Sequence, residues 1–537
     1  MKKQIAALLA AALTISAFSG CSGKDKNANS SGEIGMEQLL SASPQAVTLP
    51  LANPPVKMTM ASTVSVTSMG QTLGLGDVEA FKEMEKRTGV QMEYQTVSAE
   101  KLSLLFASND IPDMIYTNWD NLGGTYKYAV DGQLISLDNL IAENAPDFLN
   151  VLKKDNSVYE NLVDVDKHIY YFPFIRSNEK LRVFEGFQIR KDWLEKLNLQ
   201  VPKTVDNMHS VLKAFKEKDP NGNGTADEIP LISDKKLSAI DQAMNWWGIS
   251  DFYHENGTVK CGWLQPEYKE YLKTMAQWYQ EGLIDPDYLT CDATQFRSKA
   301  VNEQAGAWYG RAAGVLGTLE TAMASINPEF SIVAIPWLST DGSNGYAMPS
   351  KYVENVINIG IAITSKCKDP ALAAKWCNYA YGEDGHLLFN FGIEGESYTM
   401  EDGIPTYTEL ITKNPNGLSM QEALSRYAVP GSYAFEQSIY YFDQFMTGSQ
   451  KDAIDVWKKG DTSRTLATLK YSDSELEVAN NLKNEIDTYV GEMQSKYIVG
   501  KESIESFDSF VEKVKSMGID KVIEVMQTAY DRSASKK

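Results

Sequence analysis

The sequence predicts an α/β protein built around an open sheet flanked by helices. Two short segments with alternating apolar residues, at 56–60 and 90–94, and a third short segment at 113–116 are separated by two segments whose apolar residues have helical spacing. Parallel neighbours in a sheet need a long crossover connection, which a helix commonly supplies. Three strands joined by two such helices therefore predict an open parallel sheet at the start of the folded body.

The remaining elements follow in order along the chain. In the first helix Val78, Phe81 and Met84 lie on one face and Gly89 marks the end, and the second helix is expected at 101–108. Further strands are predicted at 186–189, 305–309, 330–335 and 356–364, and a helix at 370–381. The chain from 474 to 530 is predicted to be mostly helical.

The composition excludes two broad classes of function. The 537 residues are 43% hydrophobic and 23% charged, and no apolar run approaches the roughly 18 residues needed to span a bilayer, so we expect a soluble globular protein. Lys and Arg number 51 against 71 Asp and Glu, a net charge of −20 that repels nucleic acid and anionic lipid. We therefore expect no nucleic-acid partner and no integral membrane domain.

The first 20 residues have the features of a targeting signal. Lys2 and Lys3 precede an apolar stretch at 5–18, and small residues lead to Cys21, as in the lipobox of bacterial lipoproteins, although Phe18 stands where that motif usually has Leu. We expect residues 1–20 to be a lipoprotein signal peptide and Cys21 to be lipidated, which would anchor the protein to the outer face of the cell membrane by lipid alone. The mature chain then has 49 basic and 71 acidic residues, a net charge of −22. An ordinary signal peptide is the alternative.

Residues 21–54 are expected to form a flexible tether, because they are rich in Ser, Asn, Gly, Lys and Pro. The folded body then spans 55–537. Its four cysteines are scattered over a long chain and do not resemble a disulfide scaffold. We assign no disulfide and no catalytic role to these residues, which are Cys261, Cys291, Cys367 and Cys377.

The sharpest local signal is a candidate calcium loop at 219–230. Ca²⁺ prefers roughly six to eight oxygen ligands, and the sharp turn of such a loop prefers glycine, which Gly224 supplies at the sixth position. The ligands would be the side chains of Asp219, Asn221, Asn223, Asp227 and Glu228 and the backbone carbonyl of Thr225. Pro230 replaces the acid usual at the twelfth position, so Glu228 would be the anchoring carboxylate. An ordinary Asn- and Gly-rich turn between a helix and a strand is the alternative.

Several stretches together resemble the extracellular solute-binding lipoproteins of carbohydrate ABC importers, among them the oligosaccharide- and alginate-binding ones. They are residues 189–197 with 202–204, the loop at 219–230, residues 392–398 with 402–403, and residues 518–520 with 529–532. The resemblance spans nearly the whole chain and implies a periplasmic-binding-protein-like fold of type II. Such a protein has two α/β lobes joined by crossing segments, a ligand cleft between them, and a membrane permease that receives the sugar. Relatives of this kind hold calcium in a loop of this pattern. We also expect a monomer.

Aromatic rings beside polar groups are a separate reason to expect a sugar ligand. Sugar C–H faces lie well on aromatic rings, and sugar hydroxyls need fixed polar partners. Ligands of open α/β sheets bind beyond the carboxyl ends of strands. The candidates near such ends are Trp119, Trp308 and Trp337, the pair Trp246 and Trp247 before Gly248, and the polar residues Asp120, Arg311 and Glu396. Each could instead be an ordinary core or surface residue, and Trp193, Trp278 and Trp376 are interpreted as packing residues.

No catalytic constellation is found in the sequence. The four His residues show no metal-binding spacing, and there is no nucleophile elbow, P-loop or G-x-G-x-x-G motif. We therefore predict no enzymatic activity and a protein that closes by a hinge over an oligosaccharide. The alternatives are a receptor for peptides or another small solute, a structural surface lipoprotein, and a glycoside-active enzyme.

Overall fold

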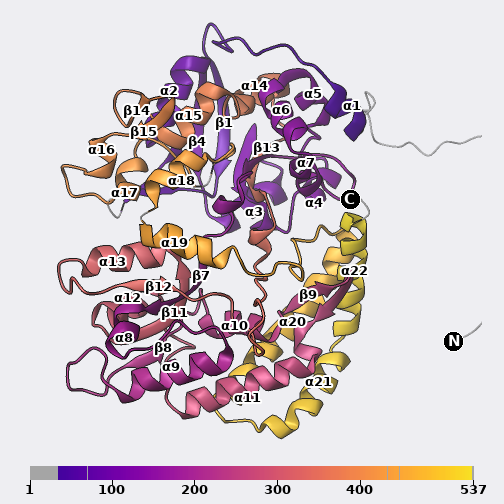
Figure 1. Ribbon diagram of the computed structural model, residues 1–537. Coiled ribbons are helices and arrows are strands. Elements are labelled where there is room, and N and C mark those ends of the chain that lie inside the picture. The colour runs from indigo at the N-terminus through magenta and orange to yellow at the C-terminus, as the bar shows by residue number, and fades with distance from the viewer. Residues whose placement is uncertain (1–33, 69–70, 432, 447, 535–537) are drawn as a thin grey trace, which may run out of the picture.

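Two lobes, each with its own sheet and hydrophobic core, make up the protein (Figure 1). The computed structural model describes residues 34–68, 71–431, 433–446 and 448–534. The core of the first lobe, at the top of Figure 1, draws on residues from 39–175 and 356–435, and that of the second on residues from 181–352 and 442–526. The predicted arrangement of two α/β lobes is therefore confirmed.

The first lobe contains a five-stranded sheet with the order β4-β1-β5-β13-β6. The strands are β1 (Val56–Ser62), β4 (Val90–Thr96), β5 (Met114–Asn118), β6 (Phe172–Ile175) and β13 (Val356–Ile363). β1 pairs in parallel with β4 and with β5, and the crossover helices are α2 (Glu79–Thr88) and α3 (Ala99–Ser108). The predicted β-α-β-α-β start is thus confirmed.

One strand of this sheet, β13, runs against the predicted parallel direction. β13 pairs antiparallel with β5 and with β6. The reason is the route of the chain, because β6 leaves the lobe at the carboxyl edge of the parallel strands and β13 re-enters at that same edge. The carboxyl ends of β1, β5 and β6 and the beginning of β13 therefore all face the second lobe (Figure 1).

Further helices surround the first sheet (Figure 1), and a small satellite unit with a core of its own adjoins it. The helices are α1 (Met36–Ser41), α4 (Tyr126–Val130), α5 (Asp138–Asn144), α6 (Pro146–Lys154), α7 (Asn156–Leu162), α14 (Pro370–Tyr379) and α15 (Glu383–Phe391). The satellite unit has a core of its own and consists of the hairpin β14 (Tyr398–Glu401) and β15 (Ile404–Tyr407) with α16 (Glu409–Thr412) and α17 (Met420–Leu424). The short hairpin β2 (Val66–Ser68) and β3 (Gln71–Leu73) contacts α17.

One helix lies inside the segment that was expected to be a flexible tether. α1 contacts α5 and α6, and its residue Leu39 is fully buried in the core of the first lobe. The segment Met36–Ser41 is therefore packed against the body, and the predicted tether boundary at residue 54 does not describe this part of the chain. Cys21 and the predicted signal peptide lie outside the described residues.

The second lobe contains a four-stranded mixed sheet with the order β12-β7-β11-β8. The strands are β7 (Glu185–Arg190), β8 (Ile229–Leu231), β11 (Ala305–Arg311) and β12 (Ile332–Ala334), which confirms the strands predicted in these regions. β11 is parallel to β8 and antiparallel to β7. β11 ends at Arg311, which pairs with Glu185 at the beginning of β7, where the chain enters this lobe, so Arg311 lies at the junction of the lobes.

Helices and one hairpin complete the second lobe. They are α8 (Lys191–Lys196), α9 (Val205–Glu217), α10 (Ala239–Ala243), α11 (Pro266–Gln280), α12 (Ala293–Val301), α13 (Thr318–Met323), α19 (Gly448–Trp457) and the hairpin β9 (Phe252–Glu255) and β10 (Thr258–Cys261). The predicted helical C-terminal part is confirmed as α20 (Asp473–Ile498), α21 (Phe507–Ser516) and α22 (Ile519–Ala534). α20 packs between α11 and α22.

The described part of the chain passes between the lobes three times. The first crossing segment, residues 176–184, follows β6, and the second, residues 353–355, leads into β13. The third runs from Glu436 into α18 (Ile439–Phe445), whose residue Phe442 joins the core of the second lobe. In the described ranges no helix is both long and apolar enough to cross a bilayer. Each of the four cysteines of the body is buried as a free thiol.

Candidate ligand-binding cleft

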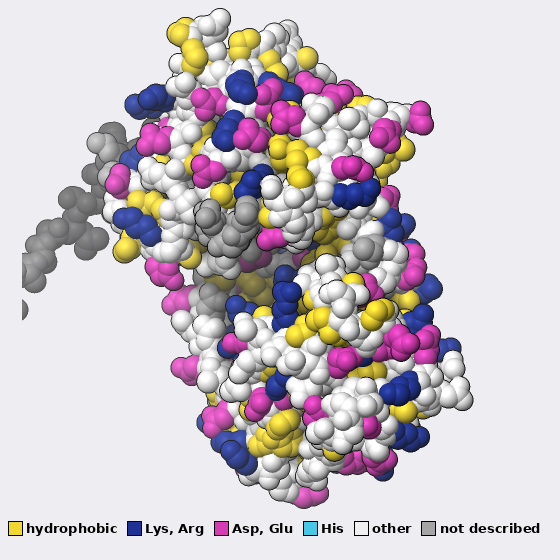
Figure 2. Space-filling model, turned by 90° about the vertical axis from the view of Figure 1, so that its left-hand side faces the viewer, with side chains coloured by type: hydrophobic (Ala, Val, Ile, Leu, Met, Phe, Trp, Pro, Cys, Tyr) yellow, Lys and Arg dark blue, Asp and Glu magenta, His cyan; other side chains and the backbone are white. Residues whose placement is uncertain are grey.

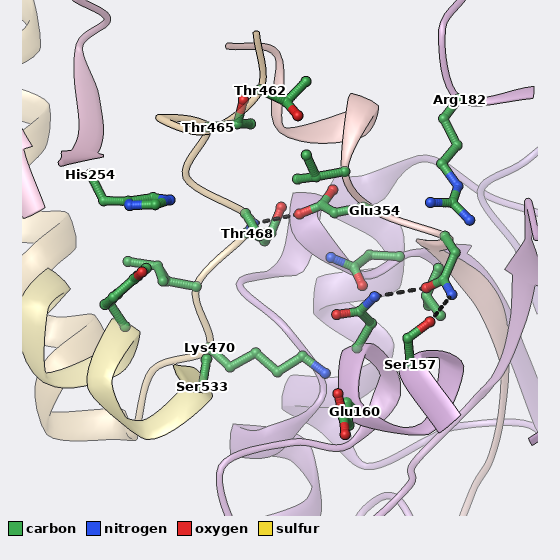
Figure 3. Close-up of a pocket in the computed structure, with 18 of the residues that line it drawn as sticks. Ser157, Glu160, Arg182, His254, Glu354, Thr462, Thr465, Thr468, Lys470 and Ser533 are labelled. Carbon is green, nitrogen blue, oxygen red and sulfur yellow. Dashed lines mark hydrogen bonds between the residues drawn. The ribbon is translucent and has the colours of Figure 1, made fainter. Parts of the chain in front are cut away.

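A polar pocket lies between the lobes, at the carboxyl edge of the first sheet (Figure 3). Its volume is about 430 Å³. We call this cavity the inter-lobe pocket. The first lobe contributes Ser157, Glu160, Asn161 and Asn358, the second contributes His254, Thr465, Thr468, Lys470, Tyr530 and Ser533, and the crossing segments contribute Arg182, Glu354 and Asn355. Side chains from both lobes therefore face one cavity, as a ligand-dependent closure requires.

Asp120, one of the sequence candidates, is held at the edge of this pocket. Asn358, which lines the pocket, donates from Nδ2 to Asp120 Oδ1 at 2.8 Å and accepts from Tyr171 Oη at 2.7 Å. Burial raises the pKa of Asp120, although part of the residue is exposed. A fixed carboxylate and a fixed amide are thus available to sugar hydroxyls here.

A second carboxylate, Glu354, links the lobes across the same pocket. The backbone N–H of Thr468 donates to Glu354 Oε1, and Lys470 Nζ donates to the carbonyl oxygen of Val163 in the first lobe. Burial raises the pKa of Glu354, and the neighbouring Asp120 raises it further. The segment that carries Thr468 and Lys470 therefore docks on the first lobe through polar contacts that a small rotation of the lobes would break or make.

A second cavity, of about 360 Å³, lies beside α17 and α18. We call it the aromatic pocket. Tyr441 and Phe445 of α18 line it with rings stacked at 5.1 Å between centroids and 28° between planes. Ser65, Gln421 and Ser425 add polar groups to the same lining.

Seen from the side of α16 and α13, the surface is hollowed between the lobes, with basic side chains at the rim of the hollow (Figure 2).

The tryptophans predicted at strand ends lie mainly in the cores. Trp119, Trp246, Trp308 and Trp337 are only 1–4% exposed. Trp119 Nε1 donates to the carbonyl oxygen of Gly360 at 3.3 Å, and Trp308 Nε1 donates to Gln188 Oε1 at 2.7 Å. Trp247 is partly buried and stacks on Trp246. In this conformation the four buried rings offer no face to a ligand, so their contacts are those of packing residues.

The other two polar candidates lie apart from each other. Arg311 is exposed at the end of β11, with Nε 3.7 Å from Glu185 Oε2. Glu396 is exposed in the loop between α15 and β14 of the satellite unit, and it lines neither pocket. The residues that sequence reasoning missed are Glu354, Asn358 and Lys470 around the inter-lobe pocket and Tyr441 and Phe445 of the aromatic pocket. The i, i+4 spacing of the last two was visible, but that spacing is equally typical of a core helix.

The loop at 219–228 is ordered by its own side chains. Asp219 accepts three backbone N–H groups, from Gly222, Asn223 and Gly224, at 2.9–3.1 Å. Asn221 and Asn223 donate from their side-chain amides to Asp227 Oδ1, which places these candidate ligands around one point. α9 enters the loop and β8 follows it, as predicted. In the described part of the chain, no group of three or more His, Cys, Asp or Glu side chains is close enough together to hold a metal ion.

Glu228 fits a cation better than any other member of the loop. The residue is 2% exposed, and neither of its carboxylate oxygens accepts a hydrogen bond from a described residue. Burial raises its pKa, and the carboxylates of Asp219 and Asp227 raise it further. A buried carboxylate without partners is costly unless a positive charge compensates it. The donor set of carboxylate, amide and carbonyl oxygens is the one that Ca²⁺ prefers.

Comparisons with known proteins agree with this architecture. The fructooligosaccharide ABC transporter substrate-binding protein FusA of Streptococcus pneumoniae is 26% identical over 564 residues, covering 99% of this chain and 98% of its own. Lipoprotein LipO of Bacillus subtilis is 25% identical, covering 84% of this chain and 89% of its own.

Solved structures show the same fold. The crystal structure of the alginate-binding protein AlgQ2 without calcium ion has a TM-score of 0.73 at 25% identity and covers 90% of this chain and 99% of that chain. An EF-hand mutant of FusA in complex with fructo-nystose has a TM-score of 0.71 at 21% identity and covers 90% of this chain and 100% of that chain. The family model for bacterial extracellular solute-binding proteins matches residues 74–386, more than half of the chain. The chain therefore belongs to the bacterial extracellular solute-binding protein family.

Proposed function

We propose that this protein captures an oligosaccharide between its lobes and delivers it unaltered to an ABC permease. The observation that carries the proposal is the inter-lobe pocket, because residues of both lobes line one polar cavity next to the crossing segments. Members of the family are binding proteins, and FusA is a fructooligosaccharide-binding member of an ABC transporter. Asn, Asp, Glu and Thr side chains in the pocket suit the hydroxyl groups of a sugar.

Closure follows from differential affinity. A sugar that contacts both lobes binds the closed conformation more tightly than the open one, so its binding shifts the population toward closure. Thr468 and Lys470 already dock on the first lobe through single hydrogen bonds, which a hinge can rearrange at low cost. The permease would then distinguish the closed surface from the open one. We propose that the protein acts as a monomer, which size-exclusion chromatography with light scattering would check.

The experiment is isothermal titration calorimetry of the mature protein with a panel of oligosaccharides and peptides, followed by product analysis. Tight binding of a glycan with no change in that glycan supports the proposal. Steady release of shorter products would make the protein an enzyme, and binding of peptides with indifference to every glycan would make it a peptide receptor.

Anchoring and calcium complete the proposal. Lipidation of Cys21 would hold the protein at the outer face of the membrane, and incorporation of labelled palmitate that Cys21→Ala abolishes would support it. Asp219, Asn221, Asn223, Asp227, Glu228 and the Thr225 carbonyl would hold Ca²⁺. Bound calcium would neutralise the carboxylates and stiffen the loop. The unpartnered oxygens of Glu228 support this assignment, as does the EF-hand of FusA.

A further inference from the structure

Three cations gather at the junction of the lobes in a chain that is otherwise strongly acidic. Arg176 begins the first crossing segment, Arg311 ends β11, and Lys351 precedes the second crossing segment. We call them the junction cations. Acidic residues outnumber basic ones by 71 to 51 in the whole chain. A local excess of positive charge at a cleft therefore departs from the composition and points to a ligand of opposite charge.

Among the described residues, one carboxylate, that of Glu185, pairs with two of these cations, Lys351 and Arg311. Glu185 is 3% exposed at the beginning of β7, and its Oε1 accepts from Tyr309 Oη at 3.0 Å and pairs with Lys351. Its Oε2 lies 3.7 Å from Arg311 Nε and accepts no hydrogen bond from any described residue. Glu185 is thus paired mainly with Lys351. The three junction cations and this one carboxylate together carry a net charge of +2.

Arg176 has no acidic partner among the described residues. Its guanidinium lies over the rings of Phe174 and Phe184, at 5.2 and 4.9 Å, and its Nε donates to the neutral Gln437 Oε1 at 3.2 Å. Burial and repulsion from Arg311 lower its pKa to about 10. Partial burial of a charge is costly without a counter-charge, which a ligand can supply.

The aromatic pocket adjoins the junction cations. Gln437, which accepts from Arg176, donates to the carbonyl oxygen of Pro430, and Pro430 lines the aromatic pocket. Tyr441 of the same pocket lies close enough to Arg176 for the two groups to interact electrostatically. A ring stacked on Tyr441 and Phe445 would therefore have a guanidinium beside it.

We infer that the ligand is an acidic oligosaccharide whose uronic-acid carboxylate binds Arg176 and Arg311 while a sugar ring stacks on Tyr441 and Phe445. Guanidinium groups match carboxylates in shape and form charge-assisted hydrogen bonds with them. The aromatic faces match the C–H face of the sugar. This inference rests on the proposed function, because it names the class of saccharide that the protein would take, and it places that ligand at the aromatic pocket and the junction cations.

The test is calorimetry of the full mature chain with oligomers of galacturonate, mannuronate and guluronate, each paired with its carboxyl-reduced form. Such pairs differ only at the carboxyl carbon. We expect one acidic oligomer to bind at least about tenfold more tightly than its reduced form, and salt to weaken that binding. A neutral oligosaccharide that binds as tightly as its acidic counterpart overturns the inference but leaves the proposed function intact. Failure of every saccharide to bind overturns both.

Variants locate the site. Arg311→Gln, at an exposed position, is expected to reduce affinity for the acidic oligomer about tenfold or more. Arg311→Lys keeps the positive charge but loses the planar guanidinium that can donate two parallel hydrogen bonds, so we expect a smaller loss of affinity. Arg297→Gln on the exposed side of α12 makes the same change in net charge and should leave affinity unchanged. Equal affinity of the Arg311→Gln and Arg297→Gln proteins, or tighter binding of a sulfated than of a carboxylated oligomer, would overturn the assignment.

Discussion

Asn358 joins Tyr171 and Asp120 by one hydrogen bond on each side, and so connects the sheet of the first lobe to the inter-lobe pocket. The amide of Asn358 accepts from the Tyr171 hydroxyl and donates to the Asp120 carboxylate. Tyr171 is 4% exposed, so its hydroxyl has little access to water. The pocket edge is therefore built on a buried polar contact.

Replacing Asn358 is expected to weaken the fold at the edge of the inter-lobe pocket. Asn358→Ala leaves the Tyr171 hydroxyl without its partner, which should lower the free energy of unfolding by about 1–3 kcal/mol. Denaturant titration measures this loss, and Ser533→Ala at the opposite wall of the pocket serves as a control expected to change stability by less than about 0.5 kcal/mol. Unchanged stability of Asn358→Ala would contradict the role given to this contact.

Glu354 should make the stability of the ligand-free protein depend on pH. Its folded-state pKa is raised mainly by burial, which outweighs the lowering by the hydrogen bond with Thr468, while Asp120 raises the pKa and Lys470 lowers it to a lesser extent. A raised carboxyl pKa means that the folded state binds more protons than the unfolded one, so this contribution to stability grows as pH falls through the folded-state pKa. Glu354→Gln should therefore be more stable than the wild type at pH 8, with a smaller advantage at pH 5. Thermal unfolding at the two pH values measures this difference, and an advantage that grows toward pH 5 would refute the assignment.

Removal of calcium should destabilise the second lobe through Glu228. We expect a chelator to lower the thermal midpoint of the wild type, because a ligand that binds only the folded state stabilises it. Glu228→Gln should abolish most of the shift, whereas Glu217→Gln, an exposed residue at the end of α9, should preserve it. If chelator leaves the thermal midpoint of all three proteins unchanged, the loop does not stabilise the protein by binding a metal ion.

Trp308 should matter for stability and not for ligand binding. Trp308→Phe keeps an aromatic ring but leaves the fully buried Gln188 without the donor to its Oε1. The expected cost is about 1–3 kcal/mol of unfolding free energy with unchanged affinity. Tyr441→Ala, in the aromatic pocket, should show the reverse pattern. Calorimetry measures the affinity of both variants, and denaturant titration measures their stability. A loss of affinity in Trp308→Phe would show that Trp308 contributes to ligand binding.

The parts of the fold that sequence reasoning found are those whose signals are local. β1, α2, β4, α3 and β5 follow one another with short connections, and Gly89 ends α2 in a left-handed conformation with φ of 69°. The signal of the candidate calcium loop is local too, because its candidate ligands lie within ten residues, and calcium binding there stays a prediction. By contrast, the direction of β13 depends on the route of the chain, which passes through the second lobe between β6 and β13. No local sequence pattern predicts that direction.

The burial of aromatic residues at strand ends also depends on distant partners. Trp119 follows β5, where a ligand-binding residue is common, but the carbonyl of Gly360 on β13 and the rings of Tyr128 and Tyr171 enclose it. Position along a strand indicates the edge of the sheet and not the exposure of a side chain. The helix α1 was missed for a related reason, since its fixed position comes from Leu39 in the core and not from helix length.

Small-angle X-ray scattering of the mature protein, with and without the tightest-binding saccharide, tests lobe closure most directly. We expect a smaller radius of gyration at saturation, with the unmodified sugar recovered afterwards. An unchanged scattering curve at full occupancy would contradict a protein that works by closing around its ligand.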